Sequence, residues 1–256
     1  YRETLSTINS LPPKIESRLR RVGDFYVDIR FSKDELRPQV VSIEGQLYSR
    51  FMDFLYLPQP PESLSTEQII AICDLRLEYM DHLVVSSLNE RIVSEIVACA
   101  KEHCAQPISP LQALDFGCGS GLSSTLLQKY WPELSLIGVD ISEKAIDRSV
   151  GQHLDARLIK PGQPLPFRDA AFDLVFAIFV MHFNVDRATL VELRRILQQS
   201  GKFVFNVYQR DIDSVIAQLQ DAGFGSLDMR EIAGAGKTHT IVSCSLPAPE
   251  ESRTRV

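Results

Sequence analysis

Two neighbouring stretches decide the fold of this chain: residues 114–121 read LDFGCGSG, and residues 134–140 read LSLIGVD. The first is an apolar run that enters a loop with glycine at alternating positions, which predicts a strand, a tight turn and a helix. The second is an apolar run ending in Asp140, which predicts the neighbouring strand with a carboxylate at its carboxyl end. Because the carboxyl ends of parallel strands share one edge of a sheet, the two stretches predict a site for a nucleotide-like ligand there.

The chain after residue 110 alternates between strand and helix patterns. Expected strands lie at 111–116, 134–140, 156–159, 172–179, 201–208, 227–232 and 238–245. Expected helices lie at 121–130, 187–198 and 211–222, and Ser142 is expected to cap a further helix. This order predicts an α/β fold with a doubly wound, mostly parallel seven-stranded sheet and helices on both faces.

Residues 1–104 have a different pattern. Apolar periodicity predicts helices at 66–87 and 90–101, and a proline-containing stretch at 105–110 is expected to act as a linker. We therefore predict three parts: an N-terminal, mainly helical cap over residues 1–104, a core over 105–246 and a disordered tail over 247–256.

Composition argues against several classes of partner. The 256 residues are 45% hydrophobic and 23% charged, and the net charge of −6 provides no field to attract nucleic acid or an anionic membrane. The five cysteines form no C-x-x-C pair, and their odd number predicts a reduced, cytoplasmic setting. No apolar run reaches the about 18 residues of a membrane span. We predict no nucleic-acid, membrane or metal partner, and the oligomeric state stays open.

The residues of the glycine loop limit the classes of ligand that it could bind. Side chains at Gly117, Gly119 and Gly121 would block a ligand from backbone N–H groups and from the amino end of the next helix. Asp140 stands where two carboxylate oxygens can accept hydrogen bonds from the two hydroxyls of a ribose. A P-loop would need Lys followed by Ser or Thr, and a dinucleotide fingerprint would need a small residue at Leu122; the sequence has neither.

A family resemblance follows from these and later residues. The motif D-x-G-x-G-x-G at 115–121, followed by Asp140, resembles motif I and its following acid in class I S-adenosylmethionine-dependent methyltransferases. Residues 165–175, LPFRDAAFDLV, resemble the family's entry into its fourth strand, and residues 194–203, RRILQQSGKF, resemble the turn into its fifth. The resemblance covers about residues 105–246 and implies a Rossmann-like fold that binds S-adenosylmethionine and releases S-adenosylhomocysteine.

The resemblance also implies roles for individual residues. Asp115 and Gly117 would lie beside the methionine moiety, Asp140 would hold the ribose, and Ile141 would pack on the adenine. The acid that usually holds the adenine amino group is missing from its usual place, which reads KPGQ here, so Asp155 further upstream is the expected substitute. The implied cofactor residues are Asp115, Phe116, Gly117, Cys118, Gly119, Gly121, Asp140, Ile141, Asp155, Ala177, Ile178 and Phe179.

Residues for the acceptor side are chosen on chemistry. Methyl transfer is an in-line displacement that depends on positioning and desolvation, and it needs a base only when the acceptor carries a proton. His182 is the natural base near neutral pH, and Tyr208, with Asn206, ends a strand at the mouth where acceptors bind. A structural role for His182 and Tyr208 is an equal alternative. In the cap, the expected acceptor-lining residues are Tyr26, Tyr48, Tyr79 and His82, with packing onto the sheet as the alternative.

The acceptor class is argued from missing motifs. Adenine-N6, cytosine-N4 and glutamine methyltransferases resemble one another in a [DNS]-P-P-Y motif, where this chain reads FVMH at 179–182, and the Pro-Cys of cytosine-C5 enzymes does not occur. A long cap before the core is typical of a site that closes over a small molecule. We predict small-molecule methylation in specialised metabolism, on O, N or C. The alternatives are a protein or peptide methyltransferase that docks through the cap, and a binding protein without catalysis.

Overall fold

The computed structural model describes residues 18–28, 38–52, 54–80, 87–102, 104, 110–234 and 237–248. The chain divides into two compact units, Tyr1–Leu64 and Ser65–Val256, and each has its own sheet. This division lies earlier than the boundary expected near residue 105. The reason is that the helices before that point bury their apolar faces in the second unit.

The first unit is an antiparallel sheet in the order β1-β2-β5-β4-β3. Its elements are β1 (Leu19–Val22), β2 (Phe25–Asp28), β3 (Val40–Ile43), β4 (Gln46–Phe51), β5 (Leu55–Leu57) and the short 3-10 helix η1 (Pro61–Ser63). The prediction of a mainly helical cap is wrong for these residues. Glu44 and Gly45 have φ of 51° and 81°, the positive values that a two-residue hairpin turn requires, and this turn joins β3 to β4.

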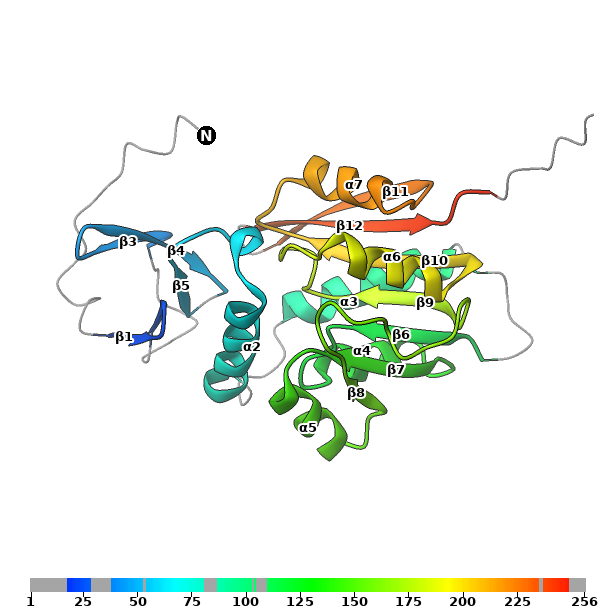
Figure 1. Cartoon of the computed structure of the whole chain (residues 1–256), viewed down its shortest axis with the longest axis horizontal. Coiled ribbons are helices and arrows are strands. Elements are labelled where there is room, and N and C mark those ends of the chain that lie inside the picture. The colour runs from blue at the N-terminus through cyan, green and yellow to red at the C-terminus, as the bar shows by residue number, and fades with distance from the viewer. Residues whose placement is uncertain are drawn as a thin grey trace, which may run out of the picture. The chain divides into compact units, whose positions relative to one another are not determined.

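The second unit contains the predicted seven-stranded sheet, in the order β11-β12-β10-β9-β6-β7-β8 (Figure 1). The strands from β10 to β8 are parallel neighbours, and β12 is antiparallel to both β10 and β11. The bounds are β6 (Gln112–Phe116), β7 (Ser135–Asp140), β8 (Ala156–Leu158), β9 (Phe172–Ala177), β10 (Leu197–Val207), β11 (Leu227–Gly234) and β12 (Lys237–Ser245). The α/β, mostly parallel fold is therefore confirmed.

The helices of this unit are α2 (Thr66–Met80), α3 (Ser87–Glu102), α4 (Leu122–Tyr130), α5 (Glu143–Gly151), α6 (Arg187–Ile196) and α7 (Ile212–Asp221). Ser142 caps α5 as predicted, since its hydroxyl accepts the Ala145 N–H at 3.1 Å. The first helix ends at Met80 rather than at residue 87, and residues 81–86 lie outside the described part of the chain.

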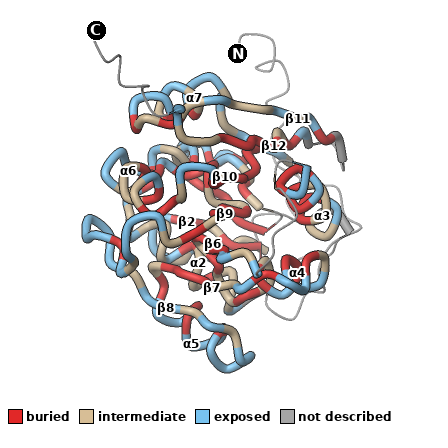
Figure 2. Tube along the Cα trace, turned by 90° about the vertical axis from the view of Figure 1, so that its right-hand side faces the viewer, coloured by how far each residue is buried: buried red, intermediate tan, exposed pale blue. Residues whose placement is uncertain are grey.

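The strands are buried on both faces, so consecutive side chains enter two different cores. Val175 and Phe203 pack in one core with Leu190 of α6 and Leu219 of α7. Their neighbours in the chain pack in the other core with α3 and α4, through residues that include Leu174, Phe176, Val204, Ile92, Ile96 and Leu127. Figure 2 shows this burial along β9 and β10. The continuous apolar runs noted in the sequence are the result of this double coverage.

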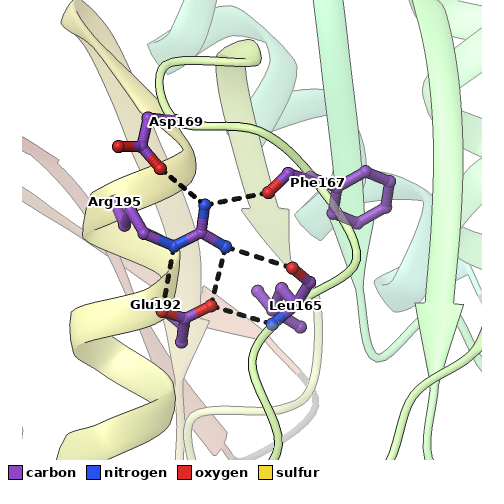
Figure 3. A network of polar contacts seen from close by, with 5 residues as sticks. All are labelled: Leu165, Phe167, Asp169, Glu192 and Arg195. Carbon is purple, nitrogen blue, oxygen red and sulfur yellow. Dashed lines mark hydrogen bonds and ion pairs between the residues drawn. The ribbon is translucent and has the colours of Figure 1, made fainter.

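Arg195 of α6 clamps the segment that leads into β9 (Figure 3). Its guanidinium donates to the backbone carbonyl oxygens of Leu165 (3.1 Å) and Phe167 (2.8 Å) and to the carboxylate of Asp169 (2.8 Å). Glu192 holds the same guanidinium through both oxygens, at 2.9 and 2.7 Å, and also accepts the Leu165 N–H at 2.8 Å. One side chain thus joins the two sequence motifs recognised at 165–175 and 194–203.

We expect Arg195→Met to lower the free energy of unfolding by about 2–3 kcal/mol, because it removes the cation paired with Glu192 and the donor to two carbonyl oxygens. Arg187→Met is the control: Arg187 forms an exposed ion pair with Asp221 (2.6 Å), and such pairs contribute about 0–1 kcal/mol. Urea unfolding of the three proteins measures the difference. Equal losses of unfolding free energy in both variants would contradict a stabilising role for the Arg195 contacts.

Candidate active site

The glycine loop joins β6 to α4 at the carboxyl edge of the sheet. Gly117 and Gly121 have φ of 76° and 90°, so both lie in the left-handed region that favours glycine. A Cβ on Gly117 would collide with Val180, and one on Gly121 with Leu154. The alternating glycines are therefore required by the backbone path itself.

The backbone N–H groups of this loop were expected to face a ligand, but three of them bond to β7 instead. The N–H groups of Gly117 and Cys118 donate to the carbonyl oxygen of Val139 in β7, at 2.8 and 3.0 Å. The Gly119 N–H donates to Oδ2 of Asp140 at 2.9 Å. These bonds attach the loop to β7, so the loop and the acid are in direct contact, as predicted. The three N–H groups are therefore bonded within the protein rather than turned toward a ligand.

Asp140 retains acceptor capacity for a ligand. Oδ2 holds the Gly119 N–H and Oδ1 holds the Ser142 N–H, each at 2.9 Å, and each carboxylate oxygen has a second lone-pair site. Burial raises the pKa of Asp140 above its ordinary value, while these N–H donors and the positive charge of Arg76 lower it. The acceptor capacity left on these oxygens suits the hydroxyl donors of a ribose.

Asp115 ends β6 and is fully buried. Its Oδ2 accepts hydrogen bonds from the hydroxyls of Ser123 and Ser124, both at 2.7 Å. Its Oδ1 has no hydrogen-bond partner among the described residues. A buried oxygen without a donor costs about 1–3 kcal/mol, so a ligand that brings an N–H to this oxygen would be stabilised.

We expect the free energy of unfolding to fall between about pH 4 and pH 6 because of Asp115. Burial raises its pKa to about 6, against about 3.9 in an unfolded chain. The folded state therefore retains a proton that the unfolded chain has released, and its stability decreases as pH rises by up to about 2–3 kcal/mol.

The measurement compares wild type with Asp115→Asn, which cannot ionise, by urea unfolding at pH 4 and at pH 7. The stability of wild type relative to the variant should decrease by about 2–3 kcal/mol across this interval. A constant difference would show that the carboxyl group is not desolvated.

A pocket adjoins the loop and is lined by five segments: α2, α3, the loop itself, α4 and the chain after β9. The lining residues are Arg76, Asn89, Val93, Gly117, Cys118, Gly119, Ser120, Leu122, Ser123, Leu126, Ile178 and Phe179. Its volume of about 30 Å³ is close to that of one water, so a nucleoside-sized ligand requires these side chains to move. Arg76 was missed by the sequence reasoning because α2 carries no motif.

The structure places the expected cofactor residues in three groups. The pocket brings together Gly117, Cys118, Gly119, Ile178 and Phe179. Asp115, Gly121, Asp140 and Ile141 lie in or directly after the elements that carry the loop and β7. Phe116 and Ala177 are buried in the core that faces α6 and α7.

Asp155 is placed unfavourably for its expected role. It precedes β8, whereas Asp140 pairs with Leu158 at the opposite end of that strand. Its side chain is 54% exposed and lies 3.5 Å from Arg157. A contact of Asp155 with adenine stays a prediction, and this placement does not favour it.

A cluster of aromatic and histidine side chains lies where β9 and β10 end and β12 begins. Phe179 has a positive φ of 59°, and its N–H donates to Oδ1 of Asn206 at 2.8 Å. The ring of Tyr208 stacks on His239 with centroids 4.8 Å apart and lies 4.8 Å from the ring of His182. The sequence reasoning missed His239, since only the antiparallel pairing of β12 with β10 brings it to this edge.

The hydrogen bonds of Asn206 determine which ring nitrogen of neutral His239 carries the proton. Because Oδ1 of Asn206 accepts the Phe179 N–H, the nitrogen Nδ2 must face His239, and it lies 3.3 Å from Nδ1. An amide nitrogen only donates, so Nδ1 of His239 accepts and the proton of the neutral ring is on Nε2.

His182 is also held neutral. It is fully buried, and burial, followed by the positive charges of Arg76 and Arg210, lowers its pKa to about 3. Arg210 fixes the surrounding turn by donating to the carbonyl oxygens of Met181 (3.0 Å) and Phe183 (2.6 Å). The histidine expected as a base is therefore a weak one.

The expected acceptor residues of the cap are dispersed. Tyr26 and Tyr48 pack edge to face within the first unit, with centroids 5.0 Å apart. Tyr79 belongs to α2, and His82 lies outside the described residues. Their role in binding an acceptor stays a prediction.

Other features of the described ranges bear on partners. All five cysteines are free. None of the helices in this part of the chain combines the length and apolar character needed to cross a bilayer. Within the same ranges, no group of three or more His, Cys, Asp and Glu side chains is arranged to hold a metal ion.

Known proteins resemble this chain mainly in the sheet and its loops. A family model described as "Methyltransferase domain" matches residues 114–205. Malonyl-[acyl-carrier protein] O-methyltransferase of Herminiimonas arsenicoxydans is 33% identical over 93 residues, which are 36% of this chain and 35% of that protein. Trans-aconitate 2-methyltransferase of Azoarcus sp. (strain BH72) is 38% identical over 97 residues, or 34% of this chain and 35% of that protein.

A third relative bears on the expected absence of nucleic acid. The 18S rRNA (guanine-N(7))-methyltransferase of Bos taurus is 24% identical over 169 residues, which are 58% of this chain and 58% of that protein. The chain thus spans between 35% and 58% of the length of these relatives. Because one of them is named for ribosomal RNA, the relatives do not support the exclusion of a nucleic-acid partner.

The fold is shared with solved structures. Phosphoethanolamine N-methyltransferase 2 of Haemonchus contortus superposes with a TM-score of 0.52 at 10% identity, over 81% of this chain and 71% of that chain. The resemblance drawn from the sequence motifs is confirmed: residues 114–205 match a methyltransferase domain, and the relatives and the shared fold agree with a class I S-adenosylmethionine-dependent methyltransferase.

Proposed function

We propose that this chain transfers the methyl group of S-adenosylmethionine to a small-molecule acceptor. One observation carries the proposal: the Gly119 N–H is bonded to the Asp140 carboxylate at 2.9 Å, at the sheet edge where the pocket lies. This bond joins the glycine loop to the acid that ends the next strand, which is the arrangement that a nucleoside cofactor requires.

The residues at this edge fit the cofactor. The lone pairs left on Asp140 would accept hydrogen bonds from the ribose hydroxyls, and Ile141 would pack on the adenine. Oδ1 of Asp115 would accept an N–H from the methionine end, and Gly117 and Phe179, which line the pocket, would border it. When bound, the cofactor supplies a methyl group on a positively charged sulfur, a good leaving group for in-line displacement.

The protein's own contribution is positioning and exclusion of water. Phe179 lines the pocket, and its ring packs with those of Tyr208 and His239 in a buried cluster that excludes solvent behind it. Tyr208 would orient the acceptor, and His182 would shape this cluster rather than remove a proton.

The relative named for trans-aconitate supports a small acceptor, and the relative named for malonyl-[acyl-carrier protein] supports an acyl group carried on a protein. The relative named for ribosomal RNA favours nucleic acid as the second candidate. A polypeptide acceptor docked through the N-terminal region, residues 1–104, and cofactor binding without catalysis, stay as alternatives. Specialised metabolism and a cytoplasmic location also stay predictions.

Calorimetric titration of the full chain with S-adenosylhomocysteine tests the cofactor assignment, and we expect saturable binding to one site. The absence of measurable binding would contradict the proposal. Transfer of label from [methyl-³H]S-adenosylmethionine to small molecules then separates an enzyme from a protein that only binds the cofactor.

A further inference from the structure

Arg76 is a cation of the pocket that is not engaged in the fold. It lines the pocket from α2, opposite the glycine loop and Phe179. No hydrogen bond or ion pair at contact distance joins its guanidinium to any residue in the described part of the chain. By contrast, the guanidinium groups of Arg187, Arg195 and Arg230 are each paired with a carboxylate.

The helix that carries Arg76 is anchored at Asp74, two residues earlier in the chain. Asp74 of the same helix accepts the Ser142 hydroxyl at 2.8 Å and lies 3.1 Å from Nζ of Lys144, both at the amino end of α5. Ser142 is itself bonded to Asp140 through its N–H. The cation is thus held over the carboxyl edge of the sheet by a connected set of contacts.

The same edge has no strong base among the described side chains of the aromatic cluster. His182 is buried with its basicity greatly reduced. His239 could take a proton on Nδ1 only by giving up its contact with the Asn206 amide. An acceptor that must lose a proton before or during methylation would therefore find no ready partner here.

A carboxylate acceptor requires neither a base nor a second cofactor. One carboxylate oxygen, already anionic, attacks the methyl carbon and forms the O–CH₃ bond of a methyl ester. The S–CH₃ bond breaks, its electron pair stays on sulfur to give neutral S-adenosylhomocysteine, and no proton is released. A guanidinium can hold the carboxylate through the other oxygen during this displacement.

We propose that the acceptor is a small carboxylic acid and that Arg76 binds its carboxylate beside the methyl group. This inference rests on the proposed function and narrows it from an unspecified acceptor to a chemical class. It assigns Arg76 to the acceptor rather than to the cofactor, which makes the two roles separable by experiment.

The test uses the full chain with [methyl-³H]S-adenosylmethionine and a panel of short mono- and dicarboxylic acids, each matched with its primary amide. Methyl esters release volatile labelled methanol in alkali, whereas N-, C- and ether-linked methyl groups do not. We expect alkali-labile label from acids and none from amides. Label in alkali-stable products only, or equal transfer to amides, would overturn the inference.

Variants of Arg76 test whether its guanidinium binds the carboxylate of the acceptor. Arg76→Met should raise KM for the acid by about 10- to 100-fold, Arg76→Lys should restore part of that loss, and Arg187→Met should change nothing. The affinity for S-adenosylhomocysteine should stay within about twofold of wild type in all three variants. A parallel loss of that affinity in Arg76→Met would assign Arg76 to the cofactor and overturn the inference.

The outcome also distinguishes the two proposals. Failure of wild type to bind S-adenosylhomocysteine contradicts the proposed function itself. Intact binding of S-adenosylhomocysteine, with no acid in the panel bound or methylated by the complex, overturns the carboxylate inference alone.

Discussion

Asp140→Ala is expected to weaken binding of S-adenosylhomocysteine on the order of 100- to 1,000-fold. The substitution removes the oxygens that would accept two ribose hydroxyls, and hydrogen bonds to a charged group contribute about 1.5–3 kcal/mol each. It also releases the Gly119 and Ser142 N–H groups, so the loop loses its attachment to β7. Titration calorimetry of the purified variant measures the change.

Asp173→Ala is the matched control. Asp173 also accepts a backbone N–H, that of Gln112 at 2.8 Å, but it does so at the amino edge of the sheet, away from the loop. We expect its affinity for S-adenosylhomocysteine to equal that of wild type. Asp140→Asn, which keeps one acceptor oxygen, should fall between wild type and Asp140→Ala. Unchanged affinity in Asp140→Ala would show that the ribose assignment is wrong.

Gly121→Ala is expected to lower the free energy of unfolding by about 3–4 kcal/mol. Its φ of 90° is unfavourable for any residue with a Cβ, and the added carbon would overlap Leu154 and lie 3.0 Å from Oγ of Ser149. Relief of the overlap requires the half-buried Leu154 side chain to rotate or the loop to shift. Urea unfolding monitored by circular dichroism gives the value.

Gly119→Ala separates the two causes of this loss. Gly119 also has a positive φ, 55°, but a Cβ there would meet no atom within 4 Å. The backbone cost alone is about 1–2 kcal/mol for an L-residue in this region. We therefore expect a loss of about 1 kcal/mol for Gly119→Ala. Similar losses in the two variants would mean that the contact with Leu154 has no energetic consequence.

The sequence was sufficient where a structure depends on residues close together in the chain. The LDFGCGSG stretch and Asp140 predict a strand, a loop, a helix and an acid at one edge, and all are found there. The glycine positions could be predicted from the sequence because the turn itself sets their backbone conformations. Alternating strands and helices also leave few topologies, since crossover connections are right-handed.

The short antiparallel strands of the first unit could not be predicted from the sequence in the same way. The strands β1 to β5 have three to six residues each, and runs this short carry too little periodicity to separate strand from helix. The turn at Glu44 and Gly45 was the available signal, and it was not used. The expected helical cap was therefore wrong there, although α2 and α3 were predicted near their observed positions.

By itself, then, the sequence determined the cofactor loop, the acid that follows it and the mostly parallel seven-stranded sheet, because each depends on local patterns or on a few chain connections. Only the tertiary structure decided the environment of the acceptor side. Pairing of β12 with β10 brings His239 to Asn206, and docking of α2 brings Arg76 over the loop, across separations that no local pattern encodes. Burial then makes His182 a poor base, since desolvation depends on how the whole unit packs around it.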